Sequence, residues 1–297
     1  MGKKAALFVN RQKDYAPELA QEIKHELEKR GAQVEIFNVE EEPEKIPDGK
    51  WDIAFSLGGD GTVLYIARNM APLGVPILPL NLGTLGFIAE VEKEGWLDVY
   101  SKWEKGEITL SRRCMLDIRV ERGGKTINKN ICLNDAVISY TEIAKLIMLD
   151  VHLESDSNSQ PVKESDTILG SYRCDGLVVA TPTGSTAYSM AAGGPILDPE
   201  MEALILNPIC PFALSSRPLV LQARHTIVIT VADKQRSGVL LTVDGQDTFP
   251  LECGDKIFIK QAPFSAELVF NGRYAYYSAL RKKLFWHPPL TEGEVHA

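Results

Sequence analysis

The sequence predicts two domains: an α/β N-terminal domain with a parallel, Rossmann-like sheet in three layers, and a mainly antiparallel β domain after it. Strand-like and helix-like apolar patterns alternate over residues 1–108, whereas strand-like patterns separated by turn residues dominate 109–274. The length of 297 residues also suits about two domains.

In the first domain, short apolar runs are expected to form buried strands. These runs are 5–9, 34–37, 53–57 and 75–80. Apolar residues recur at helical spacing over 16–27 and again over 96–103, and each pattern is followed by a glycine that can end a helix. Since strands alternate with helices, we expect parallel βαβ units whose ligands bind outside the carboxyl ends of the strands.

In the second domain, Leu116, Ile118 and Val120 alternate with polar residues, and Gly123-Gly124 fits a hairpin turn. Further strand-like runs are 131–139, 146–153, 177–180, 226–231, 239–243, 256–260 and 267–270. Helical turns are expected near 185–192 and 199–206. The aromatic residues of the tail predict that 275–297 packs back onto the first domain.

A glycine-rich segment at a strand-to-helix junction carries a strong indication of function. Residues 58–62 read Gly-Gly-Asp-Gly-Thr, directly after an apolar run and before a helical pattern. Glycines let backbone N–H groups approach a ligand closely, and a helix N-terminus adds unpaired donors that favour phosphate. Asp60 is placed to reach a hydroxyl or a metal beside that phosphate. The structural alternative is a tight turn in which Asp60 only caps the helix.

A second cluster, rich in small and hydroxyl-bearing residues, lies at 173–189. It reads Arg-Cys-Asp-Gly-Leu-Val-Val-Ala-Thr-Pro-Thr-Gly-Ser-Thr-Ala-Tyr-Ser. A strand, a turn and a capped helix would account for the order, but not for so many hydroxyls or for Arg173 and Asp175 beside a buried strand. Small side chains leave room for a flat ligand, hydroxyls can bind ribose, and Tyr188 offers a ring or hydroxyl to a base.

Composition excludes several classes of function. The chain is 44% hydrophobic and 24% charged, and its formal net charge of −8 argues against broad nucleic-acid or anionic-membrane binding. The five cysteines are widely spaced, which favours reduced thiols over disulfides or a zinc knuckle. No apolar run approaches the ~18 residues of a membrane span. We therefore expect a cytoplasmic protein that binds neither nucleic acid nor membrane.

Six motifs occur in an order that covers nearly the whole chain. They are 58–62, Asn-Leu-Gly-Thr-Leu-Gly-Phe at 81–87, Asn-Asp at 134–135, 175–189, Ser-Arg-Pro-Leu-Val at 216–220 and Asp-Gly-Gln at 244–246. Together they resemble the bacterial NAD kinases of the ATP-NAD kinase family. Members phosphorylate the 2′-hydroxyl of the adenosine ribose of NAD to give NADP. The glycine-aspartate loop is shared with lipid kinases and phosphofructokinases, whereas the Thr-Pro-Thr-Gly run with Tyr188 is more specific.

The resemblance implies a role for each matching residue. Asp60 matches the family's catalytic aspartate, which contacts the 2′-hydroxyl and is proposed to accept its proton. The phosphate loop is implied to contain Gly58, Gly59, Gly61 and Thr62. The residues implied to contact NAD are Asp60, Gly61, Phe87, Asn134, Asp135, Lys145, Arg173, Asp175, Thr186, Ala187, Tyr188, Ser189, Met190, Ala191 and Gln246.

Within this set, Asn134 and Asp135 match the pair that holds the adenine and ribose. Many members have Asn-Glu there, so the carboxylate of this chain is shorter. Arg173 and Asp175 match residues near the nicotinamide end, which in the family often come from a neighbouring subunit.

The resemblance also implies the partners. ATP is the phosphoryl donor and Mg²⁺ bridges its phosphates, with no protein ligand to the metal assigned. A homo-oligomer, dimer or tetramer, is implied, with the NAD site near a subunit interface.

Two alternatives stay open from the sequence. A diacylglycerol-type lipid kinase would share the glycine-aspartate loop, but it would need an apolar slot or an amphipathic basic segment for the membrane, and no such segment is found. A non-catalytic sensor that binds NADP would be expected to lack an acidic residue at position 60, where Asp60 is present.

Overall fold

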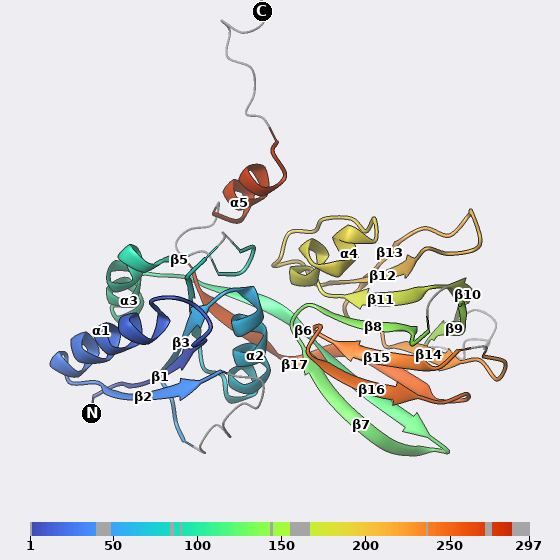
Figure 1. Cartoon of the computed structure of the whole chain (residues 1–297), viewed down its shortest axis with the longest axis horizontal. Helices are drawn as coiled ribbons and strands as arrows, with labels where there is room; N and C mark the ends of the chain where they lie inside the picture. Colours follow the sequence, from blue (N-terminus) through green and yellow to red (C-terminus); the bar gives the residue numbers. More distant parts are fainter. Residues whose placement is uncertain are drawn as a thin grey trace, which may run out of the picture. The chain divides into compact units, whose positions relative to one another are not determined.

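The computed structural model describes residues 2–39, 49–83, 86–89, 91–142, 145–154, 167–235, 237–270 and 275–286. It divides into two compact units (Figure 1). The first contains the chain up to Ser111 and the described residues from Glu267 onward, and the second is Arg112–Ala266. The predicted fold class is confirmed, because a parallel sheet with helices occurs in the first unit and antiparallel sheets occur in the second.

The first unit is built on a parallel sheet in the order β2-β1-β3-β4. Strands β1 to β5 are Lys4–Val9, Gln33–Asn38, Ile53–Gly58, Ile77–Asn81 and Val91–Glu92. The helices are α1 Ala16–Lys29, α2 Asp60–Met70, α3 Trp96–Glu104 and α5 Ala275–Lys283, with short 3₁₀ helices η1 Ala71–Leu73 and η2 Lys93–Gly95. Strand β3 is buried along its whole length and β1 along nearly all of it, which is why both appear in the sequence as continuous apolar runs.

Helices α1 and α3 share one hydrophobic core with this sheet. Leu19, Ile23 and Leu27 of α1 lie in the same buried cluster as Phe55 of β3 and Tyr100 of α3. The helical spacing of these residues in the sequence therefore marks the face that packs on the sheet.

The second unit contains two antiparallel sheets (Figure 1). Strands β6 to β11 are Leu110–Arg122, Lys125–Cys132, Asp135–Tyr140, Ile147–Leu153, Ile168–Cys174 and Gly176–Ala180. Strands β12 to β17 are Ala203–Ile209, Leu219–Gln222, Ile227–Val231, Val239–Val243, Asp247–Leu251 and Lys256–Val269. The helical segments are η4 Thr183–Thr186 and α4 Tyr188–Ala191.

One sheet has the order β13-β12-β11-β8-β15-β16, and β10-β9-β14-β17 with the hairpin β6–β7 form the other. Buried side chains of both sheets share a single core, among them Ile138 of β8 and Ile229 of β14. The predicted hairpin turn is confirmed at Gly123 and Gly124, where both φ angles are positive, 57° and 75°.

The helical prediction for residues 199–206 is wrong in its second half. Residues Ala203–Ile209 form strand β12, which is buried on both faces over most of its length. A short apolar run buried on both sides has no alternation, and the sequence pattern does not distinguish it from a buried helical turn.

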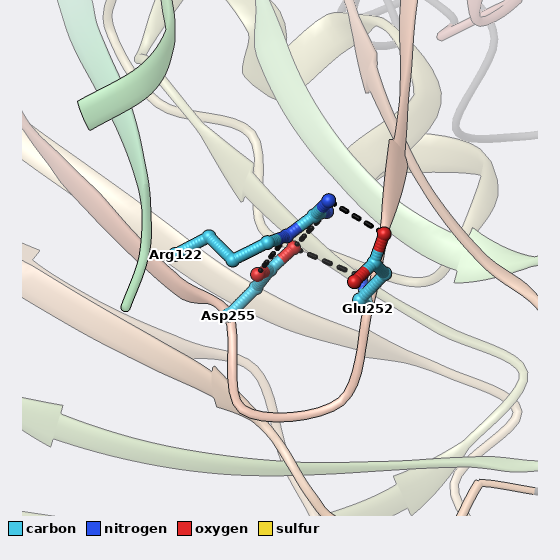
Figure 2. Close-up of polar contacts among 3 residues, drawn as sticks. All are labelled: Arg122, Glu252 and Asp255. Atoms are coloured by element: carbon cyan, nitrogen blue, oxygen red, sulfur yellow. Dashed lines mark hydrogen bonds and ion pairs between the residues drawn. The ribbon is translucent and has the colours of Figure 1, made fainter. Parts of the chain in front are cut away.

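An ion-pair cluster ties the end of β6 to the turn between β16 and β17 (Figure 2). Nε and Nη2 of Arg122 each donate to the carboxylate of Asp255 at 2.8 Å, and Nη1 donates to Glu252 at 2.6 Å. Asp255 is fully buried and also accepts the backbone N–H of Glu252.

Burial alone raises the pKa of the Asp255 carboxyl, but the hydrogen bonds from Arg122 and Glu252 outweigh it, so the pKa lies below its ordinary value. This carboxylate therefore stabilises the fold above the unfolded pKa of about 3.9. That stabilisation is lost as the pH falls through the lower pKa of the folded state.

In the described residues, no helix has the length and apolar character needed to cross a membrane.

Candidate active site

The glycine-rich loop turns the chain from the end of β3 into α2. A Cβ atom on Gly58 would lie 2.2 Å from Oγ1 of Thr62, so only glycine fits there. Gly59 is the N-cap of α2 and has an extended backbone, with φ −115° and ψ −169°. Open space surrounds the position that a Cβ of Gly59 would occupy. The loop therefore leaves its backbone accessible beside the N-terminus of a helix, where unpaired N–H groups favour anions.

Asp60, the first residue of α2, holds a second loop through its carboxylate. Oδ2 accepts the backbone N–H of Phe87 at 2.9 Å, and Oδ1 accepts those of Ile88 at 3.2 Å and Ala89 at 2.9 Å. A Cβ on Gly86 would lie 1.9 Å from Oδ1 of Asp60, so glycine is required at that position too. The carboxylate thus joins two of the sequence motifs, 58–62 and 81–87.

These contacts leave the carboxylate able to bind a further donor. A carboxylate offers about four lone-pair positions, and the three backbone N–H groups use one on Oδ2 and two on Oδ1. Asp60 is only partly buried. Among the residues that the structure describes, no other donor contacts Oδ2, so one position on it is available to a hydroxyl, and the three backbone contacts fix the direction of the carboxylate.

Two lysines bring positive charge to the loop at 81–89. Nζ of Lys283, at the end of α5, lies 4.0 Å from the ring centroid of Phe87. Nζ of Lys13 lies 3.4 Å from the position that a Cβ of Gly83 would occupy. Both cations belong to the same unit as Asp60.

In the second unit, a carboxylate again holds three consecutive backbone N–H groups. Oδ2 of Asp244 accepts the N–H of Leu133 at 3.0 Å, and Oδ1 accepts those of Asn134 at 2.8 Å and Asp135 at 3.3 Å. Asp244 lies directly after β15 and is 7% exposed. The predicted pair Asn134 and Asp135 is thereby held at the start of β8.

Asp135 is the most strongly perturbed acid of this cluster. Burial, and next the negative charge of Asp244, raise its pKa from 3.8 to about 7. The backbone N–H of Tyr188 donates to the Asp135 carboxyl and opposes this shift. That hydrogen bond joins the Asn-Asp motif to the segment at 183–191. Asp135 is therefore a buried carboxyl that titrates near neutral pH, as is typical of functional sites.

The segment that follows β11 packs closely on the same motif. Oγ1 of Thr181 donates to the carbonyl of Leu133 at 2.5 Å and accepts the N–H of Gly184 at 3.1 Å. A Cβ on Gly184 would lie 2.1 Å from the carbonyl oxygen of Asn134. Oδ1 of Asn134 and Oγ1 of Thr183 are buried and have no hydrogen-bond partner in the described chain. Buried polar atoms normally have partners, so these two are candidates for contact with a ligand.

Comparison with known proteins identifies the family. The ATP-NAD kinase N-terminal domain matches residues 3–108, and the ATP-NAD kinase C-terminal domain matches 133–270. The NAD kinase of Treponema denticola is 38% identical over 287 residues, 96% of each chain. The chain belongs to the ATP-NAD kinase family. The predicted family and enzyme class are thus confirmed, and with them the conversion of NAD to NADP by a phosphotransferase that uses ATP.

Other relatives of this kinase agree. The NAD kinase of Symbiobacterium thermophilum is 38% identical over 290 residues, 95% of this chain and 98% of its own. Yeast NADH kinase in complex with NADH has a TM-score of 0.81 at 23% identity, covering 98% of this chain and 90% of its own. An NAD kinase from Archaeoglobus fulgidus in complex with ATP has a TM-score of 0.69 at 24% identity, covering 94% and 98%. These two structures show the shared fold.

The remaining residues predicted to contact NAD differ in burial and in their contacts. The Tyr188 side chain is 48% exposed, whereas Ser189 is buried and its backbone carbonyl accepts a hydrogen bond from Asn207 at 2.9 Å. The guanidinium of Arg173 lies 4.7 Å from the ring centroid of Phe212. Thr186 is buried, Ala187 and Met190 are partly buried, and Ala191 and Gln246 are exposed.

Two further predicted residues lie between strands, Lys145 just before β9 and Asp175 between β10 and β11. Lys145 pairs with the carboxylate of Glu142. Asp175 follows Arg173 after one residue, and its backbone N–H donates to the carbonyl of Ile209.

Sequence reasoning missed three residues that shape the site: Gly86, Thr181 and Asp244. All three lie in or beside recognised motifs, but their contacts depend on tertiary structure. Asp244 is followed by Gly245, which reads as a turn, and its partners lie 109 to 111 residues earlier in the chain. Its position in a motif next to Gln246 was the available signal.

In the part of the chain that the structure describes, no group of three or more His, Cys, Asp or Glu residues could hold a metal ion. A magnesium cage made only of protein ligands is therefore not found among these residues. Magnesium commonly keeps several waters and binds through substrate phosphates with one or two carboxylates.

Proposed function

We propose that this kinase transfers the γ-phosphoryl group of ATP to the 2′-hydroxyl of the adenosine ribose of NAD, with Asp60 as the residue that receives and orients that hydroxyl. The observation that carries the proposal is the carboxylate of Asp60. It is fixed by three backbone N–H groups and, within the described part of the chain, keeps one lone-pair position on Oδ2. It also lies at the N-terminus of α2 beside a glycine loop, where phosphate is favoured.

The chemistry requires alignment more than a strong base. Phosphoryl transfer passes through a loose transition state in which the attacking and leaving oxygens are roughly in line. The 2′-hydroxyl donates its hydrogen bond to Oδ2 of Asp60, its oxygen attacks the γ-phosphorus, and the bond to the β-phosphate oxygen breaks to release ADP. The proton passes to the carboxylate and then to solvent. Well-oriented reactants can account for about 7–11 kcal/mol of the barrier at best.

The donor phosphates are proposed to lie on the glycine loop. The loop residues Gly58, Gly59, Gly61 and Thr62 would contact them, and Lys13 and Lys283 supply positive charge in a chain whose net charge is −8. Bound Mg²⁺ would be held mainly by the ATP phosphates and water, and it would supply neutralisation of their charge.

NAD is proposed to bind through the cluster in the second unit. Oδ1 of Asn134 is a buried acceptor without a partner and suits the adenine amino group. The carboxyl of Asp135 suits the ribose hydroxyls, and Tyr188 supplies ring contact. The other proposed contacts are those of Phe87, Lys145, Arg173, Asp175, Thr186, Ala187, Ser189, Met190, Ala191 and Gln246.

A homo-oligomer, dimer or tetramer, is part of the proposal, with Arg173 and Asp175 acting at the nicotinamide end of NAD. Size-exclusion chromatography with light scattering measures the oligomeric state. A monomer at concentrations that support full activity would contradict this part.

Incubation with ATP, Mg²⁺ and NAD tests the proposed function, with NADP measured through an NADP-specific dehydrogenase. We expect NADP to form in step with ADP, and nuclear magnetic resonance of the product to place the phosphate on the 2′-oxygen. A diacylglycerol offered in parallel should remain unphosphorylated. Phosphorylation of the lipid instead of NAD, or tight NADP binding without ADP release, would contradict the proposal.

A further inference from the structure

Asp244, in the turn between β15 and β16, forms hydrogen bonds with the backbone of residues 133–135. The proposed function gives it no role. We infer that Asp244 is a positioning residue for NAD binding: its carboxylate fixes the backbone of residues 133–135 and thereby directs the side chains of Asn134 and Asp135. This inference rests on the proposed function, in which those two side chains contact NAD.

The contacts between Asp244 and residues 133–135 run in both directions. The three backbone N–H groups of Leu133, Asn134 and Asp135 donate to the Asp244 carboxylate at 3.0, 2.8 and 3.3 Å. In return, the backbone N–H of Asp244 donates to the carbonyl of Asp135 at 2.9 Å. Asp244 is 7% exposed and Asn134 is 8% exposed, so these charge-assisted bonds lie away from water, where they are strongest.

Strand β11 pairs with this segment on one side, where Ala180 lies opposite Asp135 and the N–H of Thr181 donates to the carbonyl of Asn134. On the side of β15, regular sheet pairing ends before residues 133–135. Strand β8 pairs with β15 from Ala136 to Tyr140, where Val243 is the last paired residue of β15. Beyond Val243 the chain enters a turn. There the carboxylate of Asp244, rather than a paired strand, accepts the backbone N–H groups of residues 133–135. The residues that it holds are the ones proposed to face the ligand.

The backbone of the turn makes a clean substitution possible. Asp244 has φ 52° and Gly245 has φ 66°, so both lie in the left-handed region. Aspartate and asparagine both tolerate this region better than most residues. Asp244→Asn therefore keeps the size and the backbone preference, but it replaces one acceptor oxygen by an NH₂ group that opposes a backbone N–H.

A role in the turn alone would not require a charge here. The negative charge of Asp244 stands beside the buried carboxyl of Asp135 and, after burial itself, is the next largest cause of its raised pKa. A neutral residue could support the turn without this repulsion. The charge does serve the three N–H donors, since an ionised acceptor binds them more strongly than a neutral one.

The test compares Asp244→Asn with Asp233→Asn in the full-length kinase. Asp233 is exposed on the connection between β14 and β15, so it controls for the same chemical change in the same unit. We expect Asp244→Asn to raise the KM for NAD by about tenfold or more, in line with lost charged hydrogen bonds. The KM for ATP and the kcat at saturating NAD should stay within about threefold of wild type. Asp233→Asn should match the wild type.

The pH dependence of kcat/KM for NAD is a second measurement. A purely structural role of Asp244 would leave the apparent pKa in this profile unchanged. The groups that face the Asp135 carboxyl are the Asp244 carboxylate and the Tyr188 backbone N–H. Removing the charge of Asp244 should lower the apparent pKa on the acid side of kcat/KM for NAD. Dissociation constants for NAD from calorimetry should rise with the KM.

An unchanged KM for NAD in a folded Asp244→Asn variant would overturn the inference. The inference would also be overturned if the KM for ATP and the KM for NAD rose by the same factor while kcat and the melting temperature fell. That result indicates general damage to the fold. Failure of the wild-type chain to form NADP would instead count against the proposed function.

Discussion

Asp60 in the first unit and Asp244 in the second hold their loops in the same way, since each carboxylate accepts three consecutive backbone N–H groups. Their surroundings differ. Asp60 is partly exposed at the start of a helix, whereas Asp244 is buried in a turn. The same hydrogen-bond arrangement therefore suits two different purposes. In the proposed function, it leaves Asp60 able to contact a substrate, and in our further inference it makes Asp244 a support for the side chains of Asn134 and Asp135.

Both loops also depend on a glycine at the point of closest approach. A Cβ on Gly86 would lie 1.9 Å from the carboxylate of Asp60, and one on Gly184 would lie 2.1 Å from the carbonyl of Asn134. In the first case a side chain is in the way, and in the second a backbone carbonyl. The second obstacle has less freedom to move.

The largest effect is expected for Asp60→Asn. The amide keeps one acceptor, but it places an NH₂ group against a backbone N–H and cannot take the proton of the 2′-hydroxyl. We expect kcat to fall by about a hundredfold or more, with NAD still bound. Steady-state kinetics with calorimetry for NAD measures both quantities. Unchanged turnover would rule out the role of Asp60 and remove the contrast with Asp244.

The next largest effects are expected for Gly184→Ala and Gly86→Ala. Gly184→Ala forces a shift of the Asn134 backbone, so the KM for NAD should rise by about tenfold and the free energy of unfolding should fall by about 1–3 kcal/mol. Gly86→Ala displaces the carboxylate of Asp60, so kcat should fall by about tenfold. Kinetics and thermal melts distinguish these outcomes.

Gly95→Ala is the control for both glycine variants. A Cβ on Gly95 would have no neighbour within 4 Å, and its φ of −96° suits alanine. Its kinetics should equal those of the wild type. A KM for NAD that rises in Gly86→Ala but not in Gly184→Ala would contradict the division of roles.

A smaller effect is expected for Tyr188→Ala. The side chain is 48% exposed, and its backbone N–H, which donates to Asp135, is retained in the variant. We expect the KM for NAD to rise by about three- to tenfold through lost ring contact, with the KM for ATP unchanged. Stability should change by less than about 0.5 kcal/mol, as is usual at exposed positions. A KM that rises only for ATP would count against this placement.

The smallest expected effect is on stability, in Asp135→Asn. The pKa of Asp135 is raised from 3.8 to about 7, so between these values the folded chain holds a proton that the unfolded chain releases. Stability therefore falls as the pH rises toward 7, and the cost of the charged form is complete above it. At pH 8 the variant should melt at a higher temperature than the wild type, by about 2–4 °C for each kcal/mol of relieved cost.

At pH 5 this difference should shrink, because the wild-type carboxyl is then protonated. Thermal melts at both pH values make the measurement, with Asp233→Asn as the control. A variant that is less stable than the wild type at pH 8 would indicate that burial and the charge of Asp244 do not raise the pKa of Asp135.

Much of the first unit could be predicted because its signals are local. The buried strands β1 and β3 read as apolar runs, and the glycine-aspartate loop stands at the junction of β3 and α2. The partners of Asp60 could not be predicted in the same way. They lie 27 to 29 residues later in the chain, and the sequence marks their loop without indicating what holds it.

In the second unit the sequence identified the Asn-Asp pair but not its support. Asp244-Gly245 has the local character of a turn, and only the pairing of β8 with β15 brings Asp244 to Leu133. Strand β12 was missed for the opposite reason, because burial on both faces removes the alternation that marks a strand. Contacts set by tertiary structure therefore account for what the sequence left out.

Amide hydrogen exchange resolved by nuclear magnetic resonance tests most directly whether each carboxylate holds its own loop. We expect Asp60→Asn to speed exchange at Phe87, Ile88 and Ala89 and to leave residues 133–135 protected. Asp244→Asn should do the reverse, and Asp233→Asn should change neither loop. Unaltered protection of residues 87–89 in Asp60→Asn, or equal loss at both loops in either variant, would contradict this expectation.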